Sequence, residues 1–368
     1  MSEEISDYGL AHPVHAKSIP APRLNYEPRF PADLTTPIGL IGAGGISQHH
    51  LAAYRNAGLN VVAICDIDHK RADERRQAFY PYAAVFDDYH QLLADESIVI
   101  VDVATHPRER VPIVELAIRA GKHVLSQKPF VEDLSDGERL VQLAQDHGVQ
   151  LAVNQNGRWA PHFSYLREAV HGNLIGDVSS VDFVMQWDHT WTADTPFNQI
   201  HHLLLYDFAI HWFDMATVLM GDAQPERVWA SVRRSSYQRA TPPFLTHVGI
   251  DYPTAQVRLA LNANVIHGQE DRTTVVGETG TIRSFGPSIN EQTVELWTEQ
   301  GVASPKLHGR WFDTGFAGTM GELMCAIAEN RQPSNNAADN LRSLALCFAA
   351  ISSADTGQPV RPGDVRST

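Results

Sequence analysis

Five short runs of apolar residues, separated by segments with helical features, limit the fold of this chain most tightly. The runs are IGLIG, VVAIC, IVIVDVA, HVLS and LAV, all between Pro37 and Val153. They are apolar throughout and do not alternate with polar residues, which is typical of parallel strands buried on both faces. Strands that alternate with helices predict an α/β domain with a doubly wound parallel sheet.

Beyond Val153 the apolar pattern becomes an alternating one. Large apolar residues alternate with polar or smaller residues over Val181 to Met185 and again over Gln256 to Asn262. Alternation is typical of strands with one buried and one solvated face, so an α+β domain with an open mixed or antiparallel sheet is predicted. Because exposed apolar sheet faces associate, we expect a homo-oligomer, a dimer or tetramer, built on the face of Val257 to Leu261.

A glycine-rich turn follows the first predicted strand. It consists of Gly42, Gly44, Gly45 and Ile46, and Ser47 follows where a dinucleotide fingerprint has glycine or alanine. Glycine at 42 allows a tight strand-to-helix turn, and glycine at 44 lets the backbone approach a pyrophosphate at the helix N-terminus. Taken alone, such a cluster is equally typical of a purely structural turn.

The second strand favours the cofactor interpretation, because it ends at Asp66, roughly 20 residues after the turn. An acid at this distance accepts hydrogen bonds from the adenosine ribose and repels a 2′-phosphate, so NAD is expected. Arg71 lies nearby and keeps NADP open. We divide the chain into an N-terminal arm (1–36), an NAD(P)-binding domain (37–155) and a domain for substrate binding and oligomerisation (156–368). Five prolines keep the arm from forming long helices, and it either wraps a neighbouring surface or is disordered.

Charge and composition exclude several classes of partner. A net charge of -14 argues against nucleic acid and against anionic membranes. No apolar run approaches the roughly 20 residues that span a bilayer, and the N-terminus lacks a secretory signal, so a cytoplasmic protein is expected. The doublets His49-His50 and His201-His202 show no third ligand at a suitable spacing, and we therefore expect no metal.

Lys128 directly follows the strand that begins HVLS. Ligands of open parallel sheets bind beyond the carboxyl ends of the strands, so Lys128 is predicted to face the nicotinamide end of the cofactor. A solvated surface lysine before a turn proline is the alternative.

The apolar stretch YDFAIHWFD contains one histidine and two carboxylates, His211, Asp207 and Asp214. Read as a helix, it places Asp207 and His211 on one face, four residues apart. Buried groups of this kind need partners, and the oxidation of a carbinol needs a base. His211 is predicted to be this base, with Asp207 orienting it or holding a hydroxyl. Lys128 is predicted to bind the reacting oxygen from the cofactor side. A satisfied buried pair is the alternative.

The sequence resembles the glucose-fructose oxidoreductase, inositol dehydrogenase and rhizopine-catabolism (Gfo/Idh/MocA) family over roughly residues 37 to 360. The resemblance rests on IGLIGAGGIS, CDID, AGKHVLSQKP, GNLIGDV, DFAIHWFD and GETGTIRS. It implies a Rossmann domain, an open-faced mixed sheet, and NAD(P)-linked oxidation or reduction of sugars and cyclitols.

The resemblance also suggests site residues. Lys128 matches the lysine of a Glu-Lys-Pro motif in which Gln127 replaces the glutamate, and Asp207 and His211 match a D-x-x-x-H helix. Where the family has a glycine pair before that helix, this chain has His202 and Leu203. The residues implied to contact the cofactor are Thr105, His106 and Gln127. The residues implied to contact the substrate are Asn156, Arg158 and His202. The rings of His189 and Trp191 suit sugar stacking, although packing at a strand end explains them equally well.

Three functions compete. The first is an NAD(P)-dependent dehydrogenase that oxidises a secondary hydroxyl of a sugar, cyclitol or glycoside. The second is NAD-assisted glycoside cleavage, in which the sugar is transiently oxidised and the hydride returns. The third is a nucleotide-sensing protein without turnover, which the Asp207–His211 pair disfavours.

Overall fold

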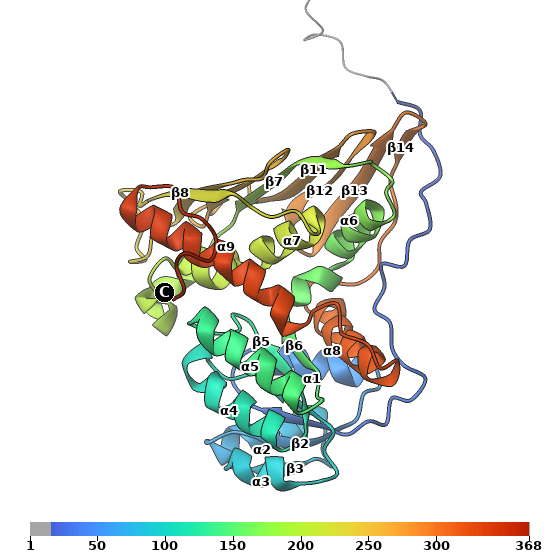
Figure 1. Ribbon diagram of the computed structural model, residues 1–368, viewed down its shortest axis with the longest axis vertical. Helices are drawn as coiled ribbons and strands as arrows, with labels where there is room; N and C mark the ends of the chain where they lie inside the picture. Colours follow the sequence, from blue (N-terminus) through green and yellow to red (C-terminus); the bar gives the residue numbers. More distant parts are fainter. Residues whose placement is uncertain (1–15, 368) are drawn as a thin grey trace, which may run out of the picture.

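The computed structural model describes residues 16–367, and its N-terminal half is built on a six-stranded parallel sheet (Figure 1). The strand order β3-β2-β1-β4-β5-β6 is that of a doubly wound dinucleotide-binding domain, which confirms the predicted fold class. The predicted apolar runs form five of the strands, and the short β3 was not predicted. The strands are β1 (Ile38–Ile41), β2 (Val61–Cys65), β3 (Ala84–Phe86), β4 (Ile100–Val103), β5 (His123–Gln127) and β6 (Leu151–Asn154).

Helices cover both faces of this sheet because its strands are apolar on both sides. Ile38 and Leu40 of β1 belong to one buried cluster, whereas Ile41 belongs to another. The connecting helices are α1 (Ser47–Asn56), α2 (His69–Phe79), α3 (Tyr89–Ala94), α4 (Pro107–Arg119) and α5 (Leu134–Asp146).

The second half contains an eight-stranded sheet in the order β14-β13-β12-β11-β7-β10-β9-β8. The β7–β10 pair is parallel and the other neighbouring pairs are antiparallel, so the predicted mixed sheet is confirmed. The strands are β7 (Val178–Gln186), β8 (Arg227–Arg233), β9 (Leu245–Asp251), β10 (Gln256–Asn262), β11 (Glu270–Gly277), β12 (Gly280–Ser288), β13 (Glu291–Thr298) and β14 (Gly301–Ala303).

Helices lie on one face of this sheet and leave the other face open (Figure 1). The longer helices of this half are α6 (Pro161–His171), α7 (Ile210–Met220), α8 (Asp313–Ala328) and α9 (Ala337–Thr356), and the short helical segments are η1 (Asn156–Trp159), η2 (Thr190–Asp194), η3 (Pro196–Gln199) and η4 (Leu204–Phe208). Val257, Leu259 and Leu261 are at most 6% exposed, in one buried cluster with residues of α6, α7 and α9. The prediction that this apolar face is free for a second chain is therefore wrong, because the chain covers it with its own helices.

Helix α8 crosses from the second half of the sequence to the parallel sheet. Phe316, Met320 and Leu323 of α8 share a buried cluster with Ile38 and Leu51 of the N-terminal half. The parallel sheet thus obtains part of its cover from residues beyond position 155.

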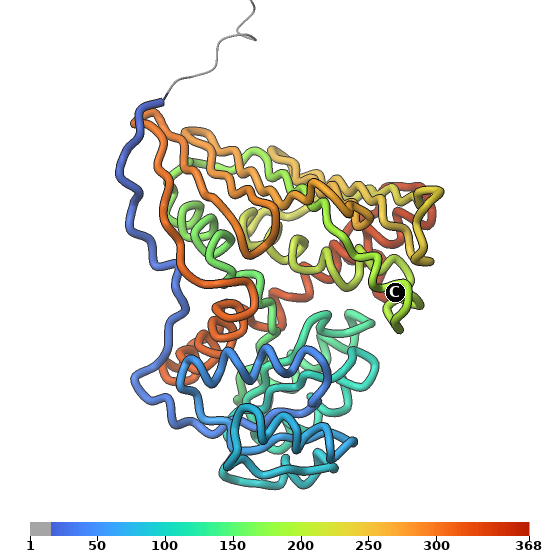
Figure 2. Tube along the Cα trace, turned by 180° about the vertical axis from the view of Figure 1, so that it is seen from behind, coloured from blue at the N-terminus to red at the C-terminus, as the bar shows by residue number. Residues whose placement is uncertain are grey.

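Residues 16–36 of the predicted arm form an extended segment that passes along both halves of the protein (Figure 2). Ser18 pairs with Val302 of β14, and the backbone oxygen of Tyr26 accepts a hydrogen bond from Ser164 of α6. Near the end of the arm, the backbone oxygen of Thr35 accepts a hydrogen bond from the side chain of Asn60. Residues 1–15, which the arm prediction also included, lie outside the described residues. Within residues 16–367, none of the helices has both the length and the apolar character required to cross a lipid bilayer.

Candidate active site

The glycine turn after β1 has the backbone geometry that a dinucleotide requires. Gly42 has φ +100, and a Cβ added there would lie 2.9 Å from the backbone carbon of Ala104, so any larger residue would clash with the loop after β4. A Cβ added at Gly44 or Gly45 would meet no atom within 4 Å, which leaves this side of the turn open. Helix α1 begins directly after Ile46. The turn therefore fits a phosphate group at a helix N-terminus.

Asp66 lies beside this turn, at the carboxyl end of β2. Its Oδ2 accepts a hydrogen bond of 2.7 Å from the Ala43 N–H, and its Oδ1 accepts one of 2.9 Å from the Asp68 N–H. Arg75 of α2, which the sequence alone did not indicate, donates to Ser47 Oγ and to the Gly44 carbonyl, each at 3.3 Å. Arg71, the reason for keeping NADP open, lies 3.8 Å from Asp68 Oδ2.

Thr105 and His106 form the loop between β4 and α4, next to Gly42. Thr105 Oγ1 is buried without a hydrogen-bond partner among the described residues, so it is available to a ligand. His106 precedes α4 and makes no side-chain capping bond. The buried Arg110 donates to the backbone oxygens of Thr105 and Pro129, which ties this loop to the segment that carries Lys128.

Lys128 reaches from the parallel-sheet domain to the second domain. Its Nζ donates to the backbone oxygen of Asp207 at 2.9 Å and to Asp207 Oδ1 at 3.3 Å. The side chains of Lys128 and Asp207 are 15% and 19% exposed, so the pair is sheltered but accessible to a small molecule. The structure thus brings together two of the three predicted catalytic residues.

Asp207 lies in a widened turn and not in the continuous helix that the sequence analysis predicted. In η4, a π-type turn, the N–H of Ala209 donates to the Leu204 oxygen at 2.7 Å, and α7 starts only at Ile210. The expected α-helical face shared by Asp207 and His211 is therefore interrupted. The polar contacts of Asp207 go to Lys128, and the role of Asp207 in orienting His211 stays a prediction.

His211 occupies the first turn of α7 and is 8% exposed. Burial, and secondly the positive charge of Lys128, hold the pKa of His211 well below its usual value. Its Nδ1 is buried without a hydrogen-bond partner within the described part of the chain. The imidazole is therefore neutral at pH 7, which is the form that a general base requires, although burial and the ammonium group also weaken it as a base.

Gln127 points into the parallel-sheet domain. Its side-chain oxygen accepts from the Lys128 N–H at 2.9 Å, and its Nε2 lies 3.4 Å from His50 Nε2. Because an amide nitrogen only donates, His50 Nε2 accepts, and His50 Nδ1 carries the proton shared with Asp102 Oδ2 at 2.7 Å. Tyr54 donates to the same Asp102 oxygen. Sequence reasoning missed this buried network, since Asp102 lies within an apolar strand and His50 within a helix.

Arg158 and Asn156 lie in η1, between the two sheets. Arg158 forms a buried two-point ion pair with Asp214 at 2.6 and 2.7 Å, which joins η1 to α7 one turn beyond His211. Asn156 donates to the backbone oxygen of Trp311 at 3.3 Å. The guanidinium of Arg158 is thus engaged by the protein, and its contact with substrate stays a prediction.

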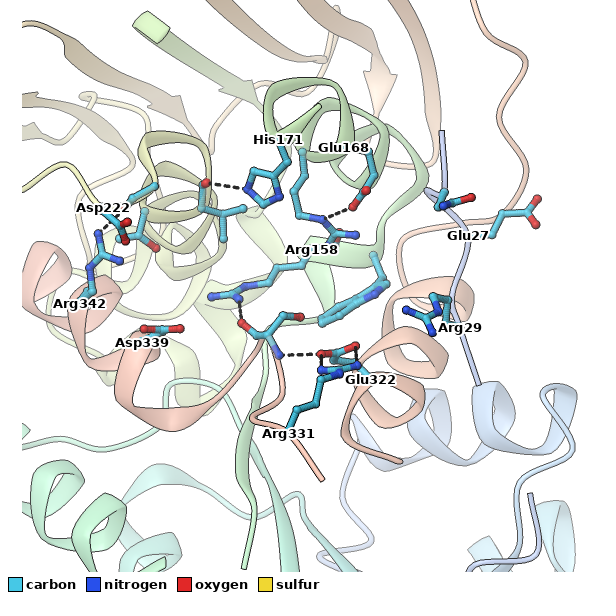
Figure 3. A pocket seen from close by; sticks show the side chains of 17 residues that line it. Glu27, Arg29, Arg158, Glu168, His171, Asp222, Glu322, Arg331, Asp339 and Arg342 are labelled. Carbon is cyan, nitrogen blue, oxygen red and sulfur yellow. Dashed lines mark hydrogen bonds and ion pairs between the residues drawn. The ribbon is translucent and has the colours of Figure 1, made fainter. Parts of the chain in front are cut away.

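A pocket of about 580 Å³ is lined in part by Arg158, and its lining contains neither Lys128 nor His211 (Figure 3). Charged side chains of both signs surround it, and most of the arginines already pair with carboxylates, such as Arg331 with Glu322 at 2.6 Å. His171 and several carboxylates also line this pocket. We keep the candidate active site at Lys128 and Asp207, because Lys128 lies at the carboxyl end of β5, where ligands of open parallel sheets bind.

An aromatic group adjoins Asp207. The rings of His189 and Phe208 meet edge to face, with 4.3 Å between their centroids. The ring of Trp191, which is 50% exposed, has its centroid 5.5 Å from that of Phe197. Burial is the main cause that lowers the pKa of His189 to about 4, and Asp188 and, less strongly, Asp207 partly oppose it. The predicted stacking role of Trp191 stays a prediction.

His202 is directed to the end of α9 rather than to Lys128. Its Nε2 lies 2.8 Å from Asp355 Oδ1, and His201 Nε2 lies 3.0 Å from Asp355 Oδ2. This third group was not evident from the sequence, because Asp355 lies more than 150 residues further along the chain.

Comparison with known proteins decides the family. The family model described as "Oxidoreductase family, NAD-binding Rossmann fold" matches residues 36–155, and the "GFO/IDH/MocA C-terminal domain" model matches residues 163–283. The chain belongs to the Gfo/Idh/MocA oxidoreductase family. Its N-terminal domain is an NAD-binding domain, in agreement with the open glycine turn and with the position of Asp66.

Relatives in this family resemble the chain along most of its length. D-apiose dehydrogenase of Paraburkholderia graminis is 27% identical over 341 residues, which cover 87% of this chain and 88% of the relative. Inositol 2-dehydrogenase of Rhizobium meliloti is 25% identical and covers 87% and 97% of the two chains. An oxidoreductase from Agrobacterium radiobacter, solved with NAD⁺, L-tartaric acid and magnesium, shares the fold with a TM-score of 0.79 at 22% identity over 89% and 98% of the chains.

Proposed function

We propose that this oxidoreductase oxidises a secondary hydroxyl group of a sugar, cyclitol or glycoside with NAD. The contact of Lys128 Nζ with Asp207 at the carboxyl end of β5 carries the proposal, because it lies where ligands of open parallel sheets bind. The relatives named D-apiose dehydrogenase and inositol 2-dehydrogenase support the substrate class.

The residues divide the work of the oxidation between them. Lys128 Nζ would bind the reacting oxygen, and Asp207 holds the ammonium group in place. The imidazole of His211 would accept the hydroxyl proton, directly or through one water, since its low pKa keeps it unprotonated. Bound NAD would accept the hydride from the carbinol carbon, and the product is a ketone.

The same site would hold NAD through residues of this chain. Gly42, Gly44 and Gly45 would receive the pyrophosphate, and Asp66 would accept hydrogen bonds from the adenosine ribose. The free Thr105 Oγ1 would contact the cofactor from the loop after β4. We favour NAD over NADP, because Asp66 lies beside the turn and would repel a 2′-phosphate.

A panel of sugars, cyclitols and glycosides tests the proposal. The purified protein is incubated with each compound and NAD, while NADH absorbance and release of aglycone are followed together. We expect NADH to accumulate with at least one compound. Aglycone release without net NADH would replace the proposal by NAD-assisted glycoside cleavage. Tight NAD binding without turnover on the whole panel would support a nucleotide-sensing protein instead.

A further inference from the structure

Three possible metal-binding side chains meet at one point on the second domain, and none of them is among the residues assigned to the proposed chemistry. They are His201, His202 and Asp355, whose ligand atoms all lie within 4.8 Å of one another. Both imidazoles approach the same carboxylate through Nε2, at 3.0 Å for His201 and 2.8 Å for His202. Two histidine nitrogens and one carboxylate oxygen are a donor set that binds divalent transition metals.

The local backbone holds these three side chains in a defined arrangement. His202 has φ +45, a left-handed conformation that is uncommon for residues other than glycine. The side chain of His202 is 6% exposed, so its ring has a fixed position. Asp355 comes from the last turn of α9, and thus the cluster joins two segments that are distant in the sequence. His201 and Asp355 are 69% and 46% exposed, which leaves room for water to complete the coordination.

The distances require only a small adjustment to admit a metal ion. In a tetrahedral site with metal–ligand bonds of about 2.0–2.1 Å, the ligand atoms lie roughly 3.3 Å apart. The contacts of 2.8 to 3.0 Å would open by a few tenths of an ångström, and the two exposed side chains are free to move by that amount. We propose that His201, His202 and Asp355 bind a divalent metal ion of the zinc type.

The bound ion would clamp the turn that leads into η4. The backbone oxygen of His202 accepts hydrogen bonds from the N–H groups of Leu205 at 2.8 Å and Tyr206 at 3.0 Å, just before Asp207. The ion would therefore fasten the η4 turn to α9. Its role is structural, because the hydrogen bonds of Lys128 Nζ go to Asp207 and not to this cluster.

Calorimetric titration of the metal-stripped, full-length protein with Zn²⁺ tests the proposal, and Co²⁺ absorbance reports the ligand set. The variants are Asp355→Asn, at an exposed ligand, and His202→Gln. His90→Gln is the control, since His90 forms a single pair with Asp88 at 2.7 Å and lacks a second histidine partner within the described residues.

We expect wild type and His90→Gln to bind one equivalent of Zn²⁺ that both other variants lose or bind at least about tenfold more weakly. If His202→Gln does not fold, Asp355→Asn alone decides. Equal stoichiometry and affinity in wild type and Asp355→Asn would overturn the proposal, as would a wild-type protein that binds no Zn²⁺.

Discussion

His211 is the residue whose environment is most informative about the chemistry. Burial and the charge of Lys128 lower the pKa of His211 below its usual value of about 6.5. The base form is therefore retained as the pH falls, and the oxidation rate declines only below about pH 6.5, when His211 gains a proton. We expect kcat plotted against pH to show an acidic limb below this value, and His211→Gln to lose it together with most turnover. A limb above pH 7 in the wild-type protein would assign the base to another group.

Asp66 sets the expected cofactor preference. Asp66→Ala removes the carboxylate that would hold the ribose and repel a 2′-phosphate, and also the acceptor for the Ala43 N–H. We expect Kd for NAD to rise by about tenfold or more, because a hydrogen bond to a charged group contributes about 1.5–3 kcal/mol. Kd for NADP should change less. Unaltered affinity for NAD would remove Asp66 from the cofactor site.

At single positions, the sequence predicted residues whose place follows from the adjacent strand. It did not predict pairs that form only when distant parts of the chain meet in the fold. Lys128 and Asp66 were predicted because each follows a strand, and strand ends of a parallel sheet converge. The Arg158–Asp214 and His202–Asp355 pairs were not predicted, because each joins residues more than 50 positions apart. The proton network of His50 and Asp102 was hidden for the same reason.

Among the elements, the extended segment of residues 16–36 and helix α8 depend on each other. Gly321 lies inside α8, and a Cβ added there would lie 2.3 Å from the backbone oxygen of Arg29. Glycine to alanine in a helix interior normally stabilises by roughly 0.5–1 kcal/mol. Gly321→Ala should instead lower the free energy of unfolding by about 1–3 kcal/mol, because the clash displaces the segment.

Denaturant unfolding of Gly321→Ala, in the full chain and in a chain without residues 1–36, measures this dependence. In the shortened chain the substitution should be neutral or stabilising. An equal loss of stability in both chains would show that the segment is not what Gly321 accommodates.

The elements also show which features the spacing of apolar residues does not predict. Continuous apolar runs predicted the parallel strands, and alternation predicted β7 and β10, because burial on two faces or one imposes these patterns. The break at η4 follows from an extra residue within one turn, which leaves the apolar pattern of YDFAIHWFD almost unchanged. A similar limit applies to β3, which has three residues and little burial.

At the scale of the whole molecule, the open face of the eight-stranded sheet replaces the apolar face as the expected interface. Trp229 is 43% exposed on this sheet, next to Gly249 of β9. We propose a homo-oligomer that packs through this face, since the other face is covered by the chain's own helices (Figure 1). Light scattering at micromolar concentration should give the mass of a dimer or tetramer, and Trp229→Glu should lower it. A monomeric mass for the wild-type protein would contradict the proposal.

Turnover of Lys128→Met tests the central claim most directly, because Lys128 joins the cofactor domain to the proposed catalytic residues. On a substrate identified with the panel, kcat of Lys128→Met is compared with kcat of wild type and of Lys70→Met, a control at a side chain that is 86% exposed. We predict a loss of about 10²–10⁴-fold for Lys128→Met alone, with NAD affinity and thermal unfolding close to those of wild type. Near-normal turnover of a folded Lys128→Met protein would contradict the account.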